Sequence, residues 1–198
     1  MPFNRNAIEE LYQRHCTRGA AISAHLSRLR HLAEGCELAV EFGVKRGFST
    51  TALLLAAQHV LSVDLVSHAE LRVLRRYADE SHWIFLQGDT RLIDIPECDL
   101  LFVDADHSYV SVNAELQRHA DKVRQWLVFH DTITFGSIAA DGETGKHRWQ
   151  HVLGLSVPPE FLGIRPAIDE LMIRDPSWRI HAHHTDSHGL LVLKRHGA

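Results

Sequence analysis

Hydrophobic and polar positions alternate between two periodicities along the middle of the chain. Five short apolar runs have the length of buried strands, and they cover residues 38–42, 60–65, 83–87, 99–105 and 126–131. Segments with helical spacing follow the first, second and fourth runs, at residues 50–58, 69–80 and 111–123. This order predicts an α/β fold in which a mostly parallel sheet is covered by helices on both faces.

The two ends of the chain follow different patterns. Within residues 1–35, apolar side chains recur at helical spacing, so this segment is predicted to be helical. Near the C-terminus we expect a helix and then a two-stranded hairpin, at residues 165–175, 178–184 and 189–195, with its turn near Asp186. The length favours one domain, made of the helical segment 1–35 and a main α/β body over residues 36–198.

The composition is typical of a globular domain. Of the 198 residues, 45% are hydrophobic and 23% are charged, which is enough apolar content for a buried core. The formal net charge of −4 argues against a nucleic-acid partner, and the apolar runs are too short to cross a membrane. We also expect no signal peptide, because the first residues are polar. Three scattered cysteines indicate reduced thiols in a cytoplasmic protein.

The first three apolar runs are followed by residues that suit a nucleotide-like ligand. Glu41, Gly43 and Gly47 lie at the end of the first apolar run. The two glycines let a ligand approach the backbone near the N-terminus of the following helix. Asp64 could accept hydrogen bonds from ribose hydroxyls, and Asp89 from an adenine amine. On its own, a tight turn explains the glycines as well as a ligand does, a helix cap could explain Asp64, and a plain Gly-Asp turn is the favoured explanation of Asp89. The spacing lacks the middle glycine of Gly-x-Gly-x-x-Gly, which disfavours an NAD-dependent dehydrogenase.

The fourth and fifth apolar runs end in acids and histidines. Asp104, Asp106 and His107 follow the fourth run, and His130 and Asp131 end the fifth. Because neighbouring parallel strands end at the same edge of a sheet, we expect Asp104, His130 and Asp131 to converge at metal-ligand distance. Carboxylates favour Mg²⁺, Ca²⁺ or Mn²⁺, and an added imidazole shifts the preference toward Mn²⁺, Fe²⁺ or Zn²⁺.

Taken in order, these motifs resemble the class I S-adenosylmethionine-dependent methyltransferases. The resemblance is stronger to a branch of small O-methyltransferases that includes cephalosporin-pathway and rhamnosyl O-methyltransferases. It rests on "VEFGVKRGFSTTALL", "SVDL", "QGDT", "FVDADHSYVSVNAEL" and "LVFHDT", and it covers roughly residues 22–195. It implies a Rossmann-like fold with a seven-stranded sheet, whose last two strands form an antiparallel hairpin.

The resemblance implies S-adenosylmethionine as the cofactor. By that comparison Glu41 contacts the amino-acid end of the cofactor, while Gly43 and Gly47 leave room for its methionine and sugar. The residues expected to bind the cofactor are Glu41, Gly43, Gly47, Ser49, Asp64, Asp89, Thr90 and Asp104. Asp104, His130 and Asp131 occupy the positions of a divalent-metal site, for which Mg or Mn is expected.

The implied reaction is methylation of a hydroxyl group on a small molecule. The acceptor oxygen must lie in line with the sulfonium methyl group and must lose its proton. Asp104, His107 and His130 are the catalytic candidates. A bound metal would lower the pKa of the hydroxyl, and without a metal either histidine could act as general base. The alternatives are a protein of this fold with another activity and a non-catalytic nucleotide-binding module.

Two further segments carry hypotheses of their own. Residues 136–160 are rich in glycine and aperiodic, so we expect a lid in which His147, Arg148 and Trp149 contact a polar or anionic acceptor bearing a ring or sugar. The stretch "HAHHTDSH" could hold a metal, although an exposed polar hairpin is the simpler explanation. The resemblance is also compatible with a homodimer formed through the N-terminal helices.

Overall fold

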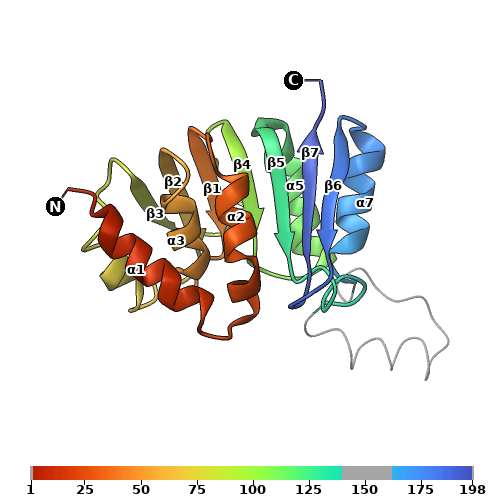
Figure 1. The fold of residues 1–198 in the computed structure, drawn as a ribbon. Helices are drawn as coiled ribbons and strands as arrows, with labels where there is room; N and C mark the ends of the chain where they lie inside the picture. Colours follow the sequence, from red (N-terminus) through yellow and green to blue (C-terminus); the bar gives the residue numbers. More distant parts are fainter. Residues whose placement is uncertain (1, 140–161, 198) are drawn as a thin grey trace.

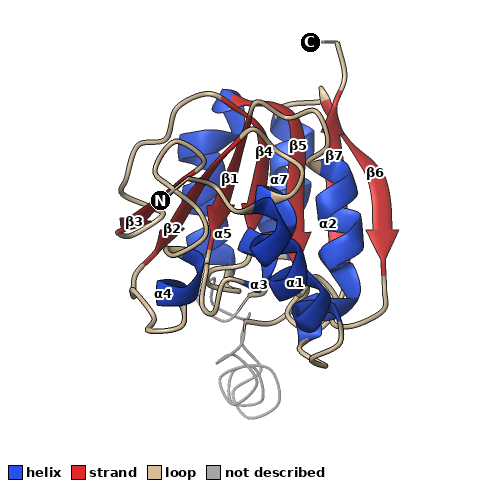
Figure 2. Ribbon diagram, turned by 60° about the vertical axis from the view of Figure 1, so that its left-hand side comes forward, coloured by secondary structure: helices blue, strands red, loops and turns tan. Residues whose placement is uncertain are grey.

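The strands form a single sheet that lies between two layers of helices (Figures 1 and 2). The structure is a computed structural model, and it describes residues 2–139 and 162–197. Within these ranges, no helix combines the length and the apolar character needed to span a membrane.

The sheet has seven strands in the order β3-β2-β1-β4-β5-β7-β6. The strands are β1 (Leu38–Phe42), β2 (His59–Asp64), β3 (Trp83–Gln87), β4 (Cys98–Val103), β5 (Val123–His130), β6 (Trp178–His184) and β7 (Leu190–Arg195). The first five are parallel, and β7 pairs antiparallel with both β5 and β6. The predicted mostly parallel seven-stranded sheet with an antiparallel C-terminal hairpin is therefore confirmed. The strand order reverses between β1 and β4, which is where ligands bind in sheets of this kind.

The helices divide between the two faces of the sheet. They are α1 (Arg5–Cys16), the 3₁₀ helix η1 (Ala21–His25), α2 (Leu26–Leu32), α3 (Phe48–Leu54), α4 (Leu71–Leu74), α5 (Tyr109–His119), the 3₁₀ turn η2 (Ala120–Lys122) and α7 (Arg165–Arg174). Successive strand side chains point to opposite faces. In β4, Leu100 and Phe102 join the hydrophobic cluster under α1 to α4, whereas Leu101 and Val103 join the cluster under α5 and α7.

The N-terminal helices are part of the main core layer. Ile8, Tyr12 and Leu29 are buried in the cluster that also contains Ala39 of β1. The Arg5 guanidinium donates to the carbonyl of Leu55 at the end of α3, at 2.6 Å. This packing brings η1 beside the carboxyl edge of the sheet, where it forms one wall of the pocket described below.

The helix expected over residues 69–80 is much shorter than predicted. Only residues 71–74 form the α-helix α4, and turns follow. The Asp79 carboxylate accepts hydrogen bonds from the Ser81 amide at 3.1 Å and from the Ser81 hydroxyl at 2.6 Å. Local bonds of this kind compete with helical hydrogen bonds, and they end the segment in a turn that leads into β3.

Candidate active site

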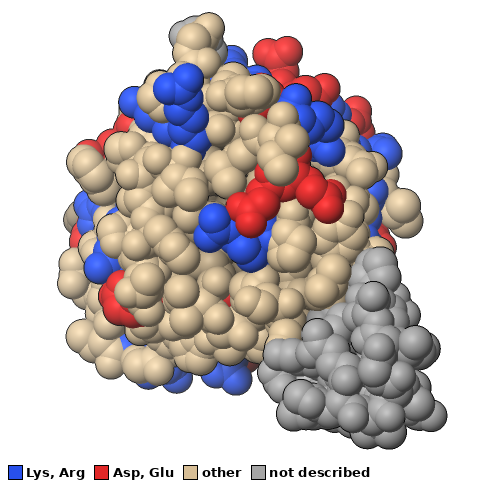
Figure 3. Space-filling view, turned by 90° about the vertical axis from the view of Figure 1, so that its right-hand side faces the viewer, with Lys and Arg blue, Asp and Glu red and all other residues tan. Residues whose placement is uncertain are grey.

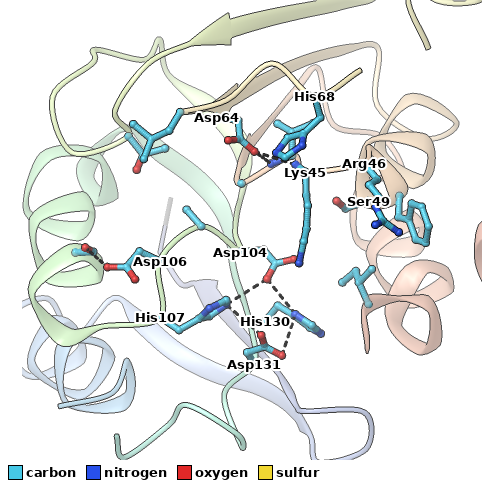
Figure 4. A pocket seen from close by; sticks show the side chains of 18 of the residues that line it. Lys45, Arg46, Ser49, Asp64, His68, Asp104, Asp106, His107, His130 and Asp131 are labelled. Atoms are coloured by element: carbon cyan, nitrogen blue, oxygen red, sulfur yellow. Dashed lines mark hydrogen bonds and ion pairs between the residues drawn. The ribbon is translucent and has the colours of Figure 1, made fainter. Parts of the chain in front are cut away.

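A cavity of about 680 Å³ opens at the carboxyl edge of the sheet (Figure 4). Its volume falls within the range of small-molecule sites. Its walls come from η1 and from the loops that follow the five parallel strands. The principal lining residues are Ala20, Ile22, Gly43, Lys45, Arg46, Phe48, Ser49, Asp64, His68, Asp89, Thr90, Arg91, Asp104, Asp106, His107, Glu115, His130 and Asp131.

The glycines of the β1–α3 loop are required by contacts within the protein itself. Gly43 has a φ of +84°, and a Cβ atom there would lie 2.2 Å from the carbonyl oxygen of Asp104. Gly47 has a φ of +76°, and its Cβ would lie 2.4 Å from Leu74. Both glycines therefore allow the loop to pack closely against its neighbours in a left-handed conformation. This packing holds the loop at the pocket rim.

Asp64 organises the same loop from the end of β2. One oxygen of its carboxylate accepts hydrogen bonds from the amides of Val44 and Lys45, both at 2.8 Å, and the other accepts from the Val66 amide at 2.9 Å. The oxygen bonded to Val66 accepts only this one hydrogen bond, so it keeps a lone pair available to a ligand. Asp64 does not cap a helix near residue 67, because α4 begins only at Leu71.

The structure does not bring Glu41 to the pocket wall, contrary to our expectation. Its side chain is fully buried on the α3 side of β1, and its carboxylate accepts from the hydroxyls of Ser49, Thr50 and Ser62. The last two bonds measure 2.7 Å. Burial raises the pKa of Glu41 to about 7, although the three hydroxyl bonds lower it in part. Ser49 lines the pocket and connects this buried carboxyl to it.

The loop after β3 supplies the opposite end of the cavity. Asp89 accepts two hydrogen bonds from the Arg91 guanidinium, at 2.9 and 2.7 Å. The Thr90 hydroxyl donates to Glu115 of α5, and the Thr90 carbonyl is 2.8 Å from Nε2 of His119. Burial raises the pKa of Glu115 to about 7. Asp89 and Thr90, which we predicted to bind the cofactor, line the pocket. Arg91 and Glu115 also line it, and the sequence analysis did not predict them as site residues.

Two acids and two histidines meet where β4 and β5 end (Figure 4). One oxygen of Asp104 lies 3.0 Å from Nδ1 of His130 and 3.3 Å from Nε2 of His107. The carboxylate of Asp131 lies 3.3 Å from the same nitrogen of each histidine. Burial by itself would raise the pKa of Asp104, but the two imidazoles outweigh it and lower that pKa. Burial would likewise lower the pKa of His130, and the two carboxylates raise it.

This cluster fits a divalent cation. Asp104, His107 and Asp131 each offer one ligand atom, and these atoms lie within 4.8 Å of one another. Oδ1 of Asp131 is buried and makes no hydrogen bond among the described residues, and its ion-pair neighbours there are Nδ1 of His130 at 3.3 Å and Nδ1 of His188 at 4.0 Å. The predicted residues Asp104, His130 and Asp131 lie together, but the group that could hold a cation contains His107 in place of His130. His130 directs Nδ1 at both carboxylates, and its Nε2 is buried without a partner in the described part of the chain.

Several pocket residues had no role in the sequence-based prediction. Lys45 extends from the β1–α3 loop into the cavity toward Asp104 (Figure 4). Its neighbour Arg46 pairs with Glu70 at 3.6 Å. The position of Lys45 and Arg46 between Gly43 and Gly47 could have indicated that these two basic side chains reach the pocket. Nothing in the sequence indicated that η1 forms a pocket wall. The predicted substrate residues His147, Arg148 and Trp149 lie outside the described residues.

A family model described as a methyltransferase domain matches residues 40–132, which span β1 to the end of β5. This part of the chain is similar to a methyltransferase domain. The match includes every parallel strand and the carboxyl-edge loops that follow them, from the glycine loop to the cluster of acids and histidines. No curated protein matches the chain.

Solved methyltransferase structures share the fold of this chain. An O-methyltransferase from Bacillus cereus, in complex with S-adenosylhomocysteine, superimposes with a TM-score of 0.63, at 16% identity over 96% of this chain and 91% of that chain. The N-methyltransferase NodS from Bradyrhizobium japonicum gives 0.59, at 17% identity over 97% and 98%. A 1,6-didemethyltoxoflavin N1-methyltransferase from Burkholderia thailandensis gives 0.60, at 15% identity over 98% and 87%. These similarities establish the fold, and they include both O- and N-methyltransferases.

Proposed function

We propose that this methyltransferase transfers the methyl group of S-adenosylmethionine to a hydroxyl oxygen of a small molecule, with a divalent cation, Mg or Mn, at the acceptor site. The observation that carries the proposal is the cluster of Asp104, His107 and Asp131 in the pocket. A hydroxyl holds its proton tightly at neutral pH, so its methylation benefits from a cation or a base, and the cluster offers both.

The placement of the cofactor in this proposal follows the pocket walls. Asp64 would accept from the ribose hydroxyls, and Asp89 would lie near the adenine ring. The methionine would pass along the Gly43–Gly47 loop toward Asp104. These residues all line the same cavity, which supports one continuous cofactor site. Ser49 and Thr90 border that path, and Glu41 acts behind it through Ser49.

The acceptor would meet the cofactor methyl group beside the cluster. Asp104, His107 and Asp131 would hold the cation, which when bound supplies a positive charge that lowers the pKa of the acceptor hydroxyl and fixes its position. Without a cation, Asp104 and Asp131 orient the His107 ring toward the site, because Nε2 of His107 lies 3.3 Å from both carboxylates. If no cation is used, His107 or His130 is within reach of the same site as a general base.

The test combines metal removal with matched variants. Chelator-treated protein should lose most of its turnover of hydroxylated small molecules, and added Mn²⁺ or Mg²⁺ should restore it. Asp131→Asn should weaken Mn²⁺ binding, measured by electron paramagnetic resonance. Asp106→Asn is the control, because Asp106 lines the same pocket and, within residues 2–139 and 162–197, its carboxylate bonds to Ser108 and Ser111 alone, at 2.7 and 2.5 Å. Full turnover after chelation would remove the cation from the proposal and leave a histidine base.

The proposal extends to partners and location. On the face seen in Figure 3, basic and acidic side chains are interspersed among neutral residues, which supports a small-molecule substrate in place of nucleic acid. The three cysteines are free, which supports a cytoplasmic location. A homodimer formed through the N-terminal helices, the absence of a membrane partner, and substrate contacts from His147, Arg148 and Trp149 remain parts of the proposal.

A further inference from the structure

The turn of the C-terminal hairpin lies against the loop that follows β5. The carbonyl of His188 accepts hydrogen bonds from the amides of Ile133 and Thr134, at 2.8 and 3.3 Å. The Thr134 hydroxyl and Nδ1 of His188 are 2.7 Å apart. On β6, Nε2 of His183 lies 3.1 Å from the Thr132 hydroxyl. The His-rich hairpin is therefore bonded to the three residues that immediately follow Asp131.

The backbone at this junction is held in an unfavourable conformation. Asp131 has a φ of +57°, and Ser187 and His188 have φ values of +44° and +72°. Among the described residues, these are three of the four non-glycine positions with positive φ, and the fourth is Lys45 at the pocket rim. A left-handed conformation is strained for a residue other than glycine, so it persists where neighbouring contacts impose it.

The N-terminal layer holds the other side of the turn. Nε2 of His25 lies 3.0 Å from the Asp186 carbonyl and 3.2 Å from the Ser187 carbonyl. Arg28 donates to the Asp186 carboxylate at 2.9 Å. The His25 ring is fully buried, and it meets the His130 ring edge-on with 5.5 Å between centroids. The turn is thus fixed between α2 and the end of β5.

We propose that the turn Asp186–Gly189, anchored by His25, is a positioning element that keeps Asp131 in its left-handed conformation. In this conformation the Asp131 carboxylate faces His107 and the Asp104 side of the pocket. The inference rests on the proposed function, because it gives the His-rich hairpin the role of supporting the cation site. The hairpin histidines act by bracing the loop, and they are not themselves ligands in this assignment.

Gly189 gives the sharpest access to this contact. Its φ is +94°, and a Cβ atom there would lie 2.7 Å from the amide nitrogen and Cγ1 of Ile133 and from the Thr132 hydroxyl. Alanine at this position would push the loop away from the turn. Gly197 provides a matched control, since its φ is +85° and no described residue lies within 4 Å of a Cβ there. The two substitutions impose similar backbone strain, and only Gly189→Ala adds the steric clash.

The experiment compares Gly189→Ala and Gly197→Ala in three measurements. Gly189→Ala should speed hydrogen exchange of the Ile133 and Thr134 amides at least tenfold, because both donate to His188. It should weaken Mn²⁺ binding at least tenfold, measured by electron paramagnetic resonance. It should leave the affinity for S-adenosylhomocysteine within about twofold, since the cofactor walls lie elsewhere in the pocket. Gly197→Ala should change none of the three.

A second pair of variants covers the case in which Gly189→Ala does not fold. His25→Leu should produce the same changes more weakly, and His25→Gln should restore amide protection because it keeps a donor for the turn carbonyls. Equal amide exchange and equal Mn²⁺ affinity in Gly189→Ala and Gly197→Ala would overturn the positioning role. Failure of the unmodified protein to bind Mn²⁺ would instead count against the proposed function, and amide exchange would still decide whether the turn holds the loop.

Discussion

Replacing Glu41 by glutamine tests the electrostatics of the buried carboxyl behind the pocket. The side chain is fully buried and bonded to three hydroxyls, and burial raises its pKa from an ordinary value of 4.5 to about 7. In the unfolded chain the carboxyl is expected to titrate near its ordinary value. The folded protein therefore holds a proton at Glu41 over a pH range in which the unfolded chain has released it.

The sign and size of the effect follow from proton linkage. Because the folded pKa is raised, the stabilising contribution of Glu41 protonation is fully present below pH 4.5 and is lost as the pH rises through about 7. The rise from 4.5 to about 7 corresponds to about 3 kcal/mol in total, of which about 2.5 kcal/mol falls between pH 5 and pH 8. Glu41→Gln cannot titrate at this position, so its stability should lack this component.

Urea unfolding followed by circular dichroism, at several values between pH 5 and pH 8, measures the difference. The free energy of unfolding of the unmodified protein, minus that of Glu41→Gln, should fall by about 2.5 kcal/mol over this range. Glu115 and the histidines titrate in both proteins, so their contributions cancel in the difference. Glu80→Gln, at an exposed position, should give no such trend. If the free energy of unfolding changes with pH in the same way in the unmodified protein and in Glu41→Gln, the pKa of Glu41 is not raised in the folded protein. Its carboxylate would then stay charged among the three hydroxyls that bond to it.

Three further outcomes are expected. Asp64→Ala should weaken S-adenosylhomocysteine binding by about 1.5–3 kcal/mol in calorimetry, because ribose hydroxyls would lose a charged acceptor, and unchanged affinity would contradict that role. Gly43→Ala should lower the free energy of unfolding by at least about 2 kcal/mol more than Gly35→Ala, since only the former has a neighbour, 2.2 Å away, in the path of its Cβ. Arg148→Ala combined with Trp149→Ala should raise the KM for the acceptor or lower kcat with cofactor affinity nearly unchanged, and an equal loss of cofactor binding would place these residues in the cofactor site.

The sequence determined the strands and the edge on which the site lies. Period-two and period-3.6 patterns are local, so the five apolar runs specified the five parallel strands, and the run at 38–42 matches β1 residue for residue. Parallel strands end at one edge, so listing the polar residues after each run was enough to bring Asp64, Asp89 and Asp104 to a common pocket. The predicted length of α4 was wrong because Asp79 forms a turn with Ser81. The hydrogen bonds of this turn compete with those of a helix, and the helical periodicity of the sequence does not reveal them.

The direction and neighbours of each polar side chain were decided by tertiary structure. Glu41 points under α3 because the β1 pleat turns it away from the cavity, and only the packed hydroxyls around it show this. His107 joins the acid cluster because the loop after β4 places its ring 3.3 Å from the Asp131 carboxylate at the end of β5, which its sequence spacing does not specify. His25 and the Asp186 carbonyl are 161 positions apart in sequence and 3.0 Å apart in space. Such contacts arise when separate helices and strands pack together, so no local pattern of hydrophobic and polar residues encodes them.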